Sequence, residues 1–149
     1  MAVAILLCAA TAEARPAKVA LDGVVRVAPR GHCGGAYIRD YKPPEPAPAP
    51  NVTLLIRKGD KNSSDKPAAE VTTGADGAFH AELAPGRYCV VFADKRSKPR
   101  KGGQYVELKC LIADWSRCDA VTDVPSDAPL AIDRRTACFG PCYHGPMPP

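Results

Sequence analysis

Residues 71–92 constrain the fold of this chain more than any other segment. Apolar and polar residues alternate there, and two turn-forming pairs, Asp76-Gly77 and Pro85-Gly86, interrupt the pattern. Glycine takes the positive φ that tight turns require, so each pair reverses the chain. The segment therefore predicts three consecutive antiparallel strands. At the strand period, the apolar side chains that should share one core are Phe79, Leu83, Tyr88, Val90 and Phe92, together with Leu54 and Ile56.

Further short strand patterns occupy residues 18–27, 51–57, 104–112 and 129–135, whereas a helical pattern is limited to one turn at 114–118. About seven short strands joined by turn-rich loops are typical of an all-β sandwich. The alternating prolines of residues 42–50 form an insertion that cannot donate ladder hydrogen bonds. We interpret it as a stiff surface spacer, with a docking segment for an aromatic groove as the alternative.

The first 14 residues are apolar and end in small side chains at Ala12 and Ala14, which predicts a signal peptide followed by a single domain over residues 15–149. The stretch lacks a positive charge, which leaves open a start upstream of Met1 or a weak signal. About 20 residues are needed to span a bilayer, so no membrane span is expected. Cys8 as a lipid-attachment cysteine is the alternative, although Leu7 is larger than such signals prefer.

Loss of Cys8 would leave six cysteines, an even number that predicts three disulfides in an exported chain: Cys33, Cys89, Cys110, Cys118, Cys138 and Cys142. Short loops favour the pairs Cys138–Cys142 and Cys110–Cys118, which leaves Cys33 with Cys89. Most of these cysteines lie in a C-terminal extension. The modest content of aromatic residues limits the hydrophobic core, so we expect disulfides to supply part of the stability. Each cross-link should add about 2–4 kcal/mol.

A zinc or copper site is the alternative for some of these cysteines, because thiolate and imidazole groups gather at His32-Cys33 and at Cys138, Cys142 and His144. The spacing differs from that of paired CxxC knuckles, and an oxidising compartment favours disulfides. We therefore expect neither a metal nor another cofactor.

The basic loop 95–101 is a candidate for contact with nucleic acid, glycans or acidic lipid, and a solvated loop is the plain alternative. The loop lacks interleaved aromatic residues, and the chain is expected outside the cytoplasm. We therefore expect no nucleic acid partner. The net charge of +4 does not by itself require a polyanionic partner. Trp115 and Tyr143 are the candidate sugar-stacking residues, with packing as their alternative role.

Catalytic residues are not evident. The chain has no GxSxG motif, and its serines lie in polar stretches without a nearby histidine, so we expect no enzyme activity. Two sequons, at Asn51 and Asn62, would matter in a eukaryotic secretory pathway.

The pattern Thr72-Thr73-x-x-Asp76-Gly77-x-Phe79, followed by Leu83-x-Pro85-Gly86-x-Tyr88-x-Val90, resembles the core motif of carboxypeptidase regulatory-like domains. The resemblance covers roughly residues 18–112. It implies a seven-stranded prealbumin-like or Ig-like β-sandwich and a non-catalytic accessory module without catalytic residues. The expected function is therefore a structural or binding role, with an unknown protein or glycan partner, outside the cell or in the cell envelope. The alternative is a carbohydrate- or small-ligand-binding protein of the envelope.

Overall fold

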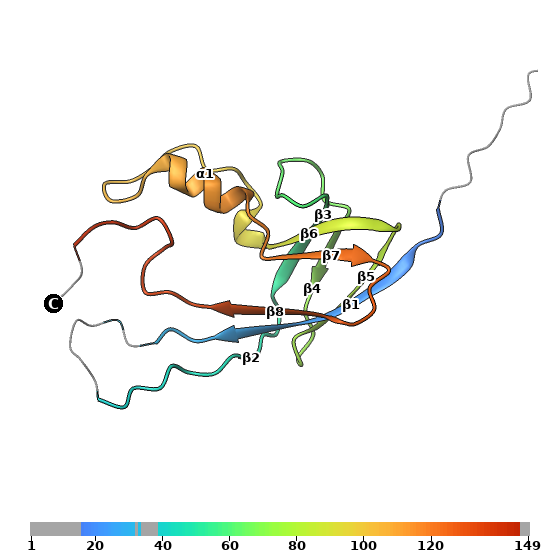
Figure 1. Ribbon diagram of the computed structural model, residues 1–149, viewed down its shortest axis with the longest axis horizontal. Coiled ribbons are helices and arrows are strands. Elements are labelled where there is room, and N and C mark those ends of the chain that lie inside the picture. Colours follow the sequence, from blue (N-terminus) through green and yellow to red (C-terminus); the bar gives the residue numbers. More distant parts are fainter. Residues whose placement is uncertain (1–15, 32, 34–38, 147–149) are drawn as a thin grey trace, which may run out of the picture.

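The structure is a computed structural model that describes residues 16–31, 33 and 39–146. The expected signal peptide, Cys8 and His32 lie outside the described residues. The chain forms, in order, β1 (Val19–Ala28), β2 (Ala47–Pro48), β3 (Thr53–Lys58), β4 (Ala69–Thr72), β5 (Ala78–Leu83), β6 (Gly86–Phe92), the 3-10 turn η1 (Ala93–Lys95), α1 (Leu108–Ser116), β7 (Ala120–Val124) and β8 (Leu130–Arg135). The strands form two four-stranded sheets (Figure 1).

Strand β1 is the centre of the first sheet. It pairs antiparallel with β5 and β2 and parallel with β8. Because β1 has ten residues and β5 only six, the C-terminal part of β1 extends beyond β5 and pairs with β2. Gly23 lies where β1 crosses the ring of Phe79: a Cβ on Gly23 would approach that ring to 2.4 Å and the carbonyl oxygen of Leu130 to 2.6 Å. Only glycine allows this close approach.

The second sheet has the order β4-β3-β6-β7, with every pair antiparallel. The turn before β5 places Gly77 at φ 75°, and the turn before β6 places Gly86 at φ 152°. Both are backbone conformations that favour glycine. The predicted turns at 76–77 and 85–86 are therefore confirmed, as are the strands that they connect.

One hydrophobic core lies between the two sheets, the arrangement expected of a β-sandwich. Both sheets contribute to it: the first through side chains such as Leu21 and Ile132, the second through Val124. The prediction of a shared core is confirmed for all seven residues: Leu54, Ile56, Phe79, Leu83, Tyr88, Val90 and Phe92. A smaller cluster of Leu55, Cys89 and Val91 lies on the other face of the second sheet.

The strand predicted at 104–112 is wrong, because residues 108–116 form the helix α1. Apolar side chains at Leu108, Leu111, Ile112 and Trp115 have helical spacing, which the strand interpretation overlooked. The predicted turn at 114–118 overlaps only the end of this helix. Strands β2 and β7 were not predicted. With these two added and the strand at 104–112 replaced by α1, the strand count is eight rather than about seven.

The proline-rich segment is also more than a spacer. Ala49 follows the two residues of β2, is buried, and donates its backbone N–H to the carbonyl oxygen of Val25 at 3.0 Å. The expectation that this segment donates no ladder hydrogen bond is therefore wrong at Ala49. The alanines between the prolines supply the donor that proline lacks.

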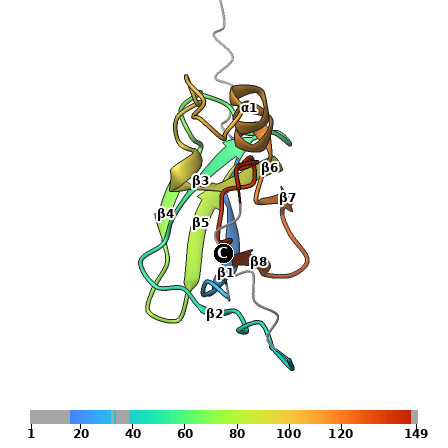
Figure 2. The same cartoon turned by 90° about the vertical axis from the view of Figure 1, so that its left-hand side faces the viewer.

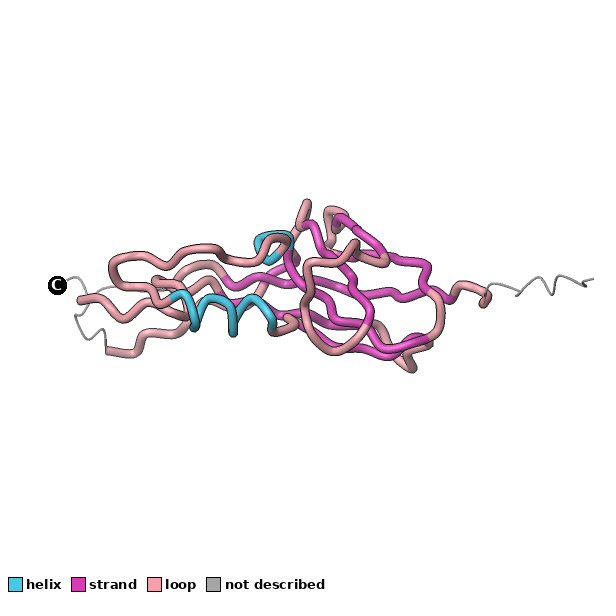
Figure 3. Tube along the Cα trace, turned by 90° about the horizontal axis from the view of Figure 1, so that it is seen from above, coloured by secondary structure: helices cyan, strands magenta, loops and turns pink. Residues whose placement is uncertain are grey.

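The molecule is elongated. The sandwich occupies one half, while α1 and long connecting segments extend from one end of the strands (Figures 1 and 3). Viewed after a turn of 90°, α1 lies at one end of the second sheet (Figure 2). The non-strand half is the part of the chain in which the disulfides gather.

Candidate functional site: a basic lobe tied by disulfides

We call three segments the basic lobe: the described residues of 28–46, and residues 93–119 and 134–146. They comprise the non-strand half together with Ala28 at the end of β1 and Arg134 and Arg135 at the end of β8. Two disulfides connect the segments: Cys33–Cys138, with Cα atoms 5.6 Å apart, and Cys110–Cys142, also at 5.6 Å. A third, Cys89–Cys118, attaches the end of the second segment to β6, with Cα atoms 5.3 Å apart. The lobe is thus fixed both internally and to the sandwich.

The prediction that all six cysteines form three disulfides is confirmed, but each predicted pair is wrong. Helix α1 explains why Cys110 does not reach Cys118. From Cys110 to Ser116 the helix alone rises about 9 Å, more than the roughly 7 Å that a disulfide spans. Cys89 lies on the face of β6 away from the main core, where Cys118 packs and Cys33 does not.

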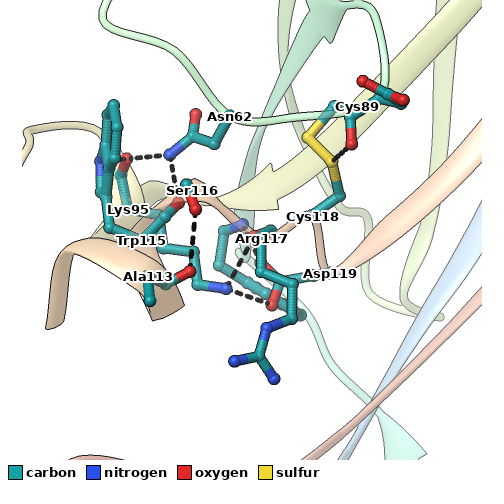
Figure 4. The surroundings of a disulfide bond; sticks show 11 residues. Asn62, Cys89, Lys95, Ala113, Trp115, Ser116, Arg117, Cys118 and Asp119 are labelled. Carbon is teal, nitrogen blue, oxygen red and sulfur yellow. Dashed lines mark hydrogen bonds and ion pairs between the residues drawn. A yellow bond between two sulfur atoms is a disulfide. The ribbon is translucent and has the colours of Figure 1, made fainter. Parts of the chain in front are cut away.

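The lobe is joined to the sandwich around Asn62, a buried residue of the β3–β4 connection (Figure 4). Its side-chain Nδ2 donates to the carbonyl oxygens of Lys95 and Trp115, both at 2.9 Å. The indole Nε1 of Trp115 donates to the same Lys95 carbonyl at 2.8 Å. We call Asn62, Lys95 and Trp115 the junction. It fixes the start of the basic loop and the end of α1 at one point.

An ion pair extends this junction. Lys95 Nζ lies 3.1 Å from Asp119 Oδ1, and the two side chains are only 15% and 21% exposed. Lys95 Nζ also donates to the carbonyl oxygen of Arg117 at 3.0 Å, while Asp119 Oδ2 accepts the backbone N–H of Phe92 at 3.0 Å. Each charged group therefore has a second hydrogen-bond partner, which offsets part of its desolvation cost.

Positive charge is concentrated in the basic lobe. The lobe contains twelve lysines and arginines and six aspartates and glutamates, whereas the remaining described residues contain seven and nine. The lobe thus carries a charge of +6 and the rest of the described chain −2. Within the described part of the chain, nine of the twelve form no ion pair with a carboxylate: Arg30, Arg39, Lys42, Lys98, Arg100, Lys101, Lys109, Arg117 and Arg135. All nine are exposed.

The remaining three cations of the lobe have carboxylate partners. Arg96 binds Glu70 through two hydrogen bonds of 2.6 and 3.0 Å, which lower the pKa of the Glu70 carboxyl and raise that of the Arg96 guanidinium. Arg134 binds Asp94, and Lys95 binds Asp119 as described. These pairs hold the basic loop. Within the described residues, its cations without a carboxylate partner are Lys98, Arg100 and Lys101, and Lys98 Nζ lies 6.0 Å from the centre of the Trp115 ring.

A cleft of about 660 Å³ lies where the lobe meets the end of the sandwich. Phe92 and Arg134 line it, with the guanidinium carbon 4.5 Å from the centre of the Phe92 ring. Arg30, Arg135 and Phe139 lie along the same cleft. Arg30 and Arg135 line the same cleft because β1 and β8 run parallel in register, with Ala28 opposite Arg135. Sequence reasoning missed this group, since only the strand pairing brings the two segments together.

The two predicted ligand-contact residues have different environments in the structure. Trp115 is only 8% exposed, and its indole nitrogen is engaged in the junction. Tyr143 is half-buried in an aromatic group of the lobe, stacked on Phe139 at 4.7 Å and edge-on to Tyr105 at 6.0 Å. Trp115 therefore has a packing role, while Tyr143 belongs to a partly exposed aromatic surface beside the cleft residue Phe139.

The chain matches no family model, no curated protein and no solved structure. Among residues 16–31, 33 and 39–146, no group of three or more His, Cys, Asp or Glu side chains is placed to hold a metal ion. No helix of that part is long and apolar enough to cross a membrane. The functional argument therefore depends on the lobe itself.

Proposed function

We propose that this chain is a secreted, non-catalytic β-sandwich module whose basic lobe binds an acidic polysaccharide. The observation that carries the proposal is the charge separation between the lobe, at +6, and the rest of the described chain, at −2. A cationic surface of this kind attracts polyanions and accelerates their association. Three disulfides in a small domain are typical of oxidising compartments, which supports a ligand found outside the cell.

The aromatic residues of the lobe favour a glycan over a lipid surface. Tyr105, Phe139 and Tyr143 form one contact group, and Tyr105 is 38% exposed. Aromatic rings offer flat apolar faces on which sugar rings stack. Arginines such as Arg30 and Arg135 suit the carboxylates of uronic acids, because a guanidinium binds a carboxylate through two parallel hydrogen bonds.

The sandwich itself is proposed to be prealbumin-like, as in carboxypeptidase regulatory-like domains. The two glycine turns and the core shared by β3, β5 and β6 support this assignment. In such a module the sandwich is the scaffold and the appended lobe carries the binding surface. A structural role without a ligand is the competing function, and it predicts no affinity for any polyanion.

The test is retention on an immobilised uronic-acid polymer, comparing two variants that each lose three positive charges. The first is Lys98→Ala/Arg100→Ala/Lys101→Ala in the basic lobe. The matched control is Lys18→Ala/Lys58→Ala/Arg87→Ala on the sandwich. Three exposed contacts at roughly 0.5 kcal/mol each amount to about 1.5 kcal/mol, or roughly a tenfold loss of affinity.

The lobe variant should therefore bind about tenfold more weakly, and the control should bind like the unaltered protein. Equal losses in both variants would show that net charge alone controls retention. No binding by the unaltered protein would favour the structural role. Equal or tighter binding of single-stranded nucleic acid by the unaltered protein would contradict the choice of a glycan, since nucleic acid also combines phosphate with stacking surfaces.

A further inference from the structure

The chain contains two sequons, Asn51-Val52-Thr53 and Asn62-Ser63-Ser64, and the structure places their asparagines in opposite environments. Either asparagine is a formal acceptor for N-linked glycan in a eukaryotic secretory pathway. The two sequons differ at their third position, which is Thr53 in the first and Ser64 in the second. Their burial and hydrogen bonds also differ.

Asn62 is 5% exposed, and its amide nitrogen is the donor that holds the junction. Both Nδ2 hydrogens are used, one toward the carbonyl of Lys95 and one toward that of Trp115. Its backbone N–H also donates to the carbonyl of Ser116 at 2.9 Å. A sugar on Nδ2 would replace one of these hydrogens and insert a bulky polar group between the lobe and the sandwich.

Asn51 is exposed in the turn that precedes β3. Its φ of 57° lies in the left-handed region, where asparagine is one of the few residues with a side chain that is well tolerated. The backbone N–H is anchored to the carbonyl of Thr73 at 3.1 Å. Within the described residues, no hydrogen bond engages the side-chain amide of Asn51, so a glycan there displaces no described contact.

We propose that Asn51 carries an N-linked glycan in the folded, exported protein and that Asn62 does not. The donor is a lipid-linked oligosaccharide diphosphate. A bond forms between Asn51 Nδ2 and the anomeric carbon of the first sugar, and the bond from that carbon to the diphosphate oxygen breaks. The lipid diphosphate leaves and the amide nitrogen loses one proton. Because transfer precedes folding, chains modified at Asn62 cannot form the junction and are lost before export.

The experiment expresses the full chain in a eukaryotic secretory host and analyses both medium and cell lysate. Glycans are released enzymatically, which converts each glycosylated asparagine to aspartate, and peptide mapping locates the change. Asn51→Gln and Thr53→Ala remove the first sequon in two different ways. Ser64→Ala removes the second sequon and leaves the Asn62 side chain in place.

Secreted protein should carry one glycan, at Asn51. The glycan should disappear in Asn51→Gln and in Thr53→Ala and remain in Ser64→Ala. Any glycan on Asn62 should be confined to the lysate. Secreted protein that lacks a glycan at Asn51, or that carries one at Asn62, would overturn the proposal. Because this readout is independent of ligand affinity, it tests the modification site separately from polysaccharide binding.

Discussion

The junction makes Asn62 the polar residue whose loss should destabilise the chain most clearly. Replacement by alanine removes two hydrogen bonds of 2.9 Å from a side chain that is 5% exposed. The Lys95 carbonyl keeps the indole N–H of Trp115 as a donor, so that loss costs about 1 kcal/mol. The Trp115 carbonyl lacks such a substitute donor among the described residues. In a continuing helix the backbone N–H of Asp119 would donate to it, but that N–H donates to the carbonyl oxygen of Val90 instead.

Leaving the Trp115 carbonyl without a donor costs about 1–3 kcal/mol. One term opposes the loss. Among the described residues no group donates to the buried Asn62 Oδ1, so its removal relieves a desolvation penalty of about 1 kcal/mol. The balance is a loss of about 2 kcal/mol in the free energy of unfolding for Asn62→Ala. Asn62→Asp should be more damaging, because a carboxylate would face two carbonyl oxygens in a buried site.

The assay is denaturant unfolding followed by fluorescence and circular dichroism. Trp115 is the only tryptophan of the chain and is part of the junction, so its fluorescence reports the attachment of the lobe. Ser64→Ala, an exposed substitution two residues away, is the control and should change stability by less than about 0.5 kcal/mol. A change for Asn62→Ala as small as that of the control would refute the junction as a stabilising element.

Three further predictions concern the core, an ion pair and a disulfide. Val90→Asp should unfold the domain, since Val90 is 0% exposed and the carboxylate would have no partner; an unchanged melting temperature would disprove the core register. The hydrogen bond that the His80 ring donates to Asp22 Oδ1 raises the pKa of His80. The pair therefore stabilises the fold below the unfolded-state pKa of His80, and that contribution is lost as pH rises through the folded-state pKa. Asp22→Asn should lower the pKa of His80 in an NMR titration, and an unaltered value would argue against the contact. Replacing Cys110 and Cys142 by alanine opens a loop of 32 residues and should lower the free energy of unfolding by about 3 kcal/mol. A decrease below about 1 kcal/mol would contradict this prediction.

Local signals decided what the sequence could predict of the fold. The turns at Gly77 and Gly86 fix the register of their strands, so the alternating apolar residues of β5 and β6 could be assigned to one core. Helix α1 was misread because its apolar residues also fit a short strand pattern, although Leu108, Leu111, Ile112 and Trp115 follow helical spacing. Short apolar runs of this kind are ambiguous until their neighbours are known.

The site depended on long-range geometry that the sequence does not encode locally. The basic loop was visible as a run of charges, but Arg30 and Arg135 are brought together only by the parallel pairing of β1 and β8. The disulfide pairs were wrong for the same reason, since loop length favoured neighbours such as Cys138 and Cys142 while the chain path brought distant cysteines together. In this protein, the residues that form the site are brought close by strand pairing and by the path of the chain, and not by nearness in the sequence.

The most direct test of polysaccharide binding by the basic lobe is a calorimetric titration of the disulfide-intact protein with a polyuronate and with the same polymer after its carboxylates are converted to neutral esters. The lobe's nine unpaired cations predict binding to the polyuronate that weakens as salt is raised, because exposed charges are screened within about 10 Å at 0.1 M salt. The neutral polymer should bind much more weakly. Equal affinity for both polymers, or an affinity for the polyuronate that is unaffected by salt, would contradict a charge-directed glycan site.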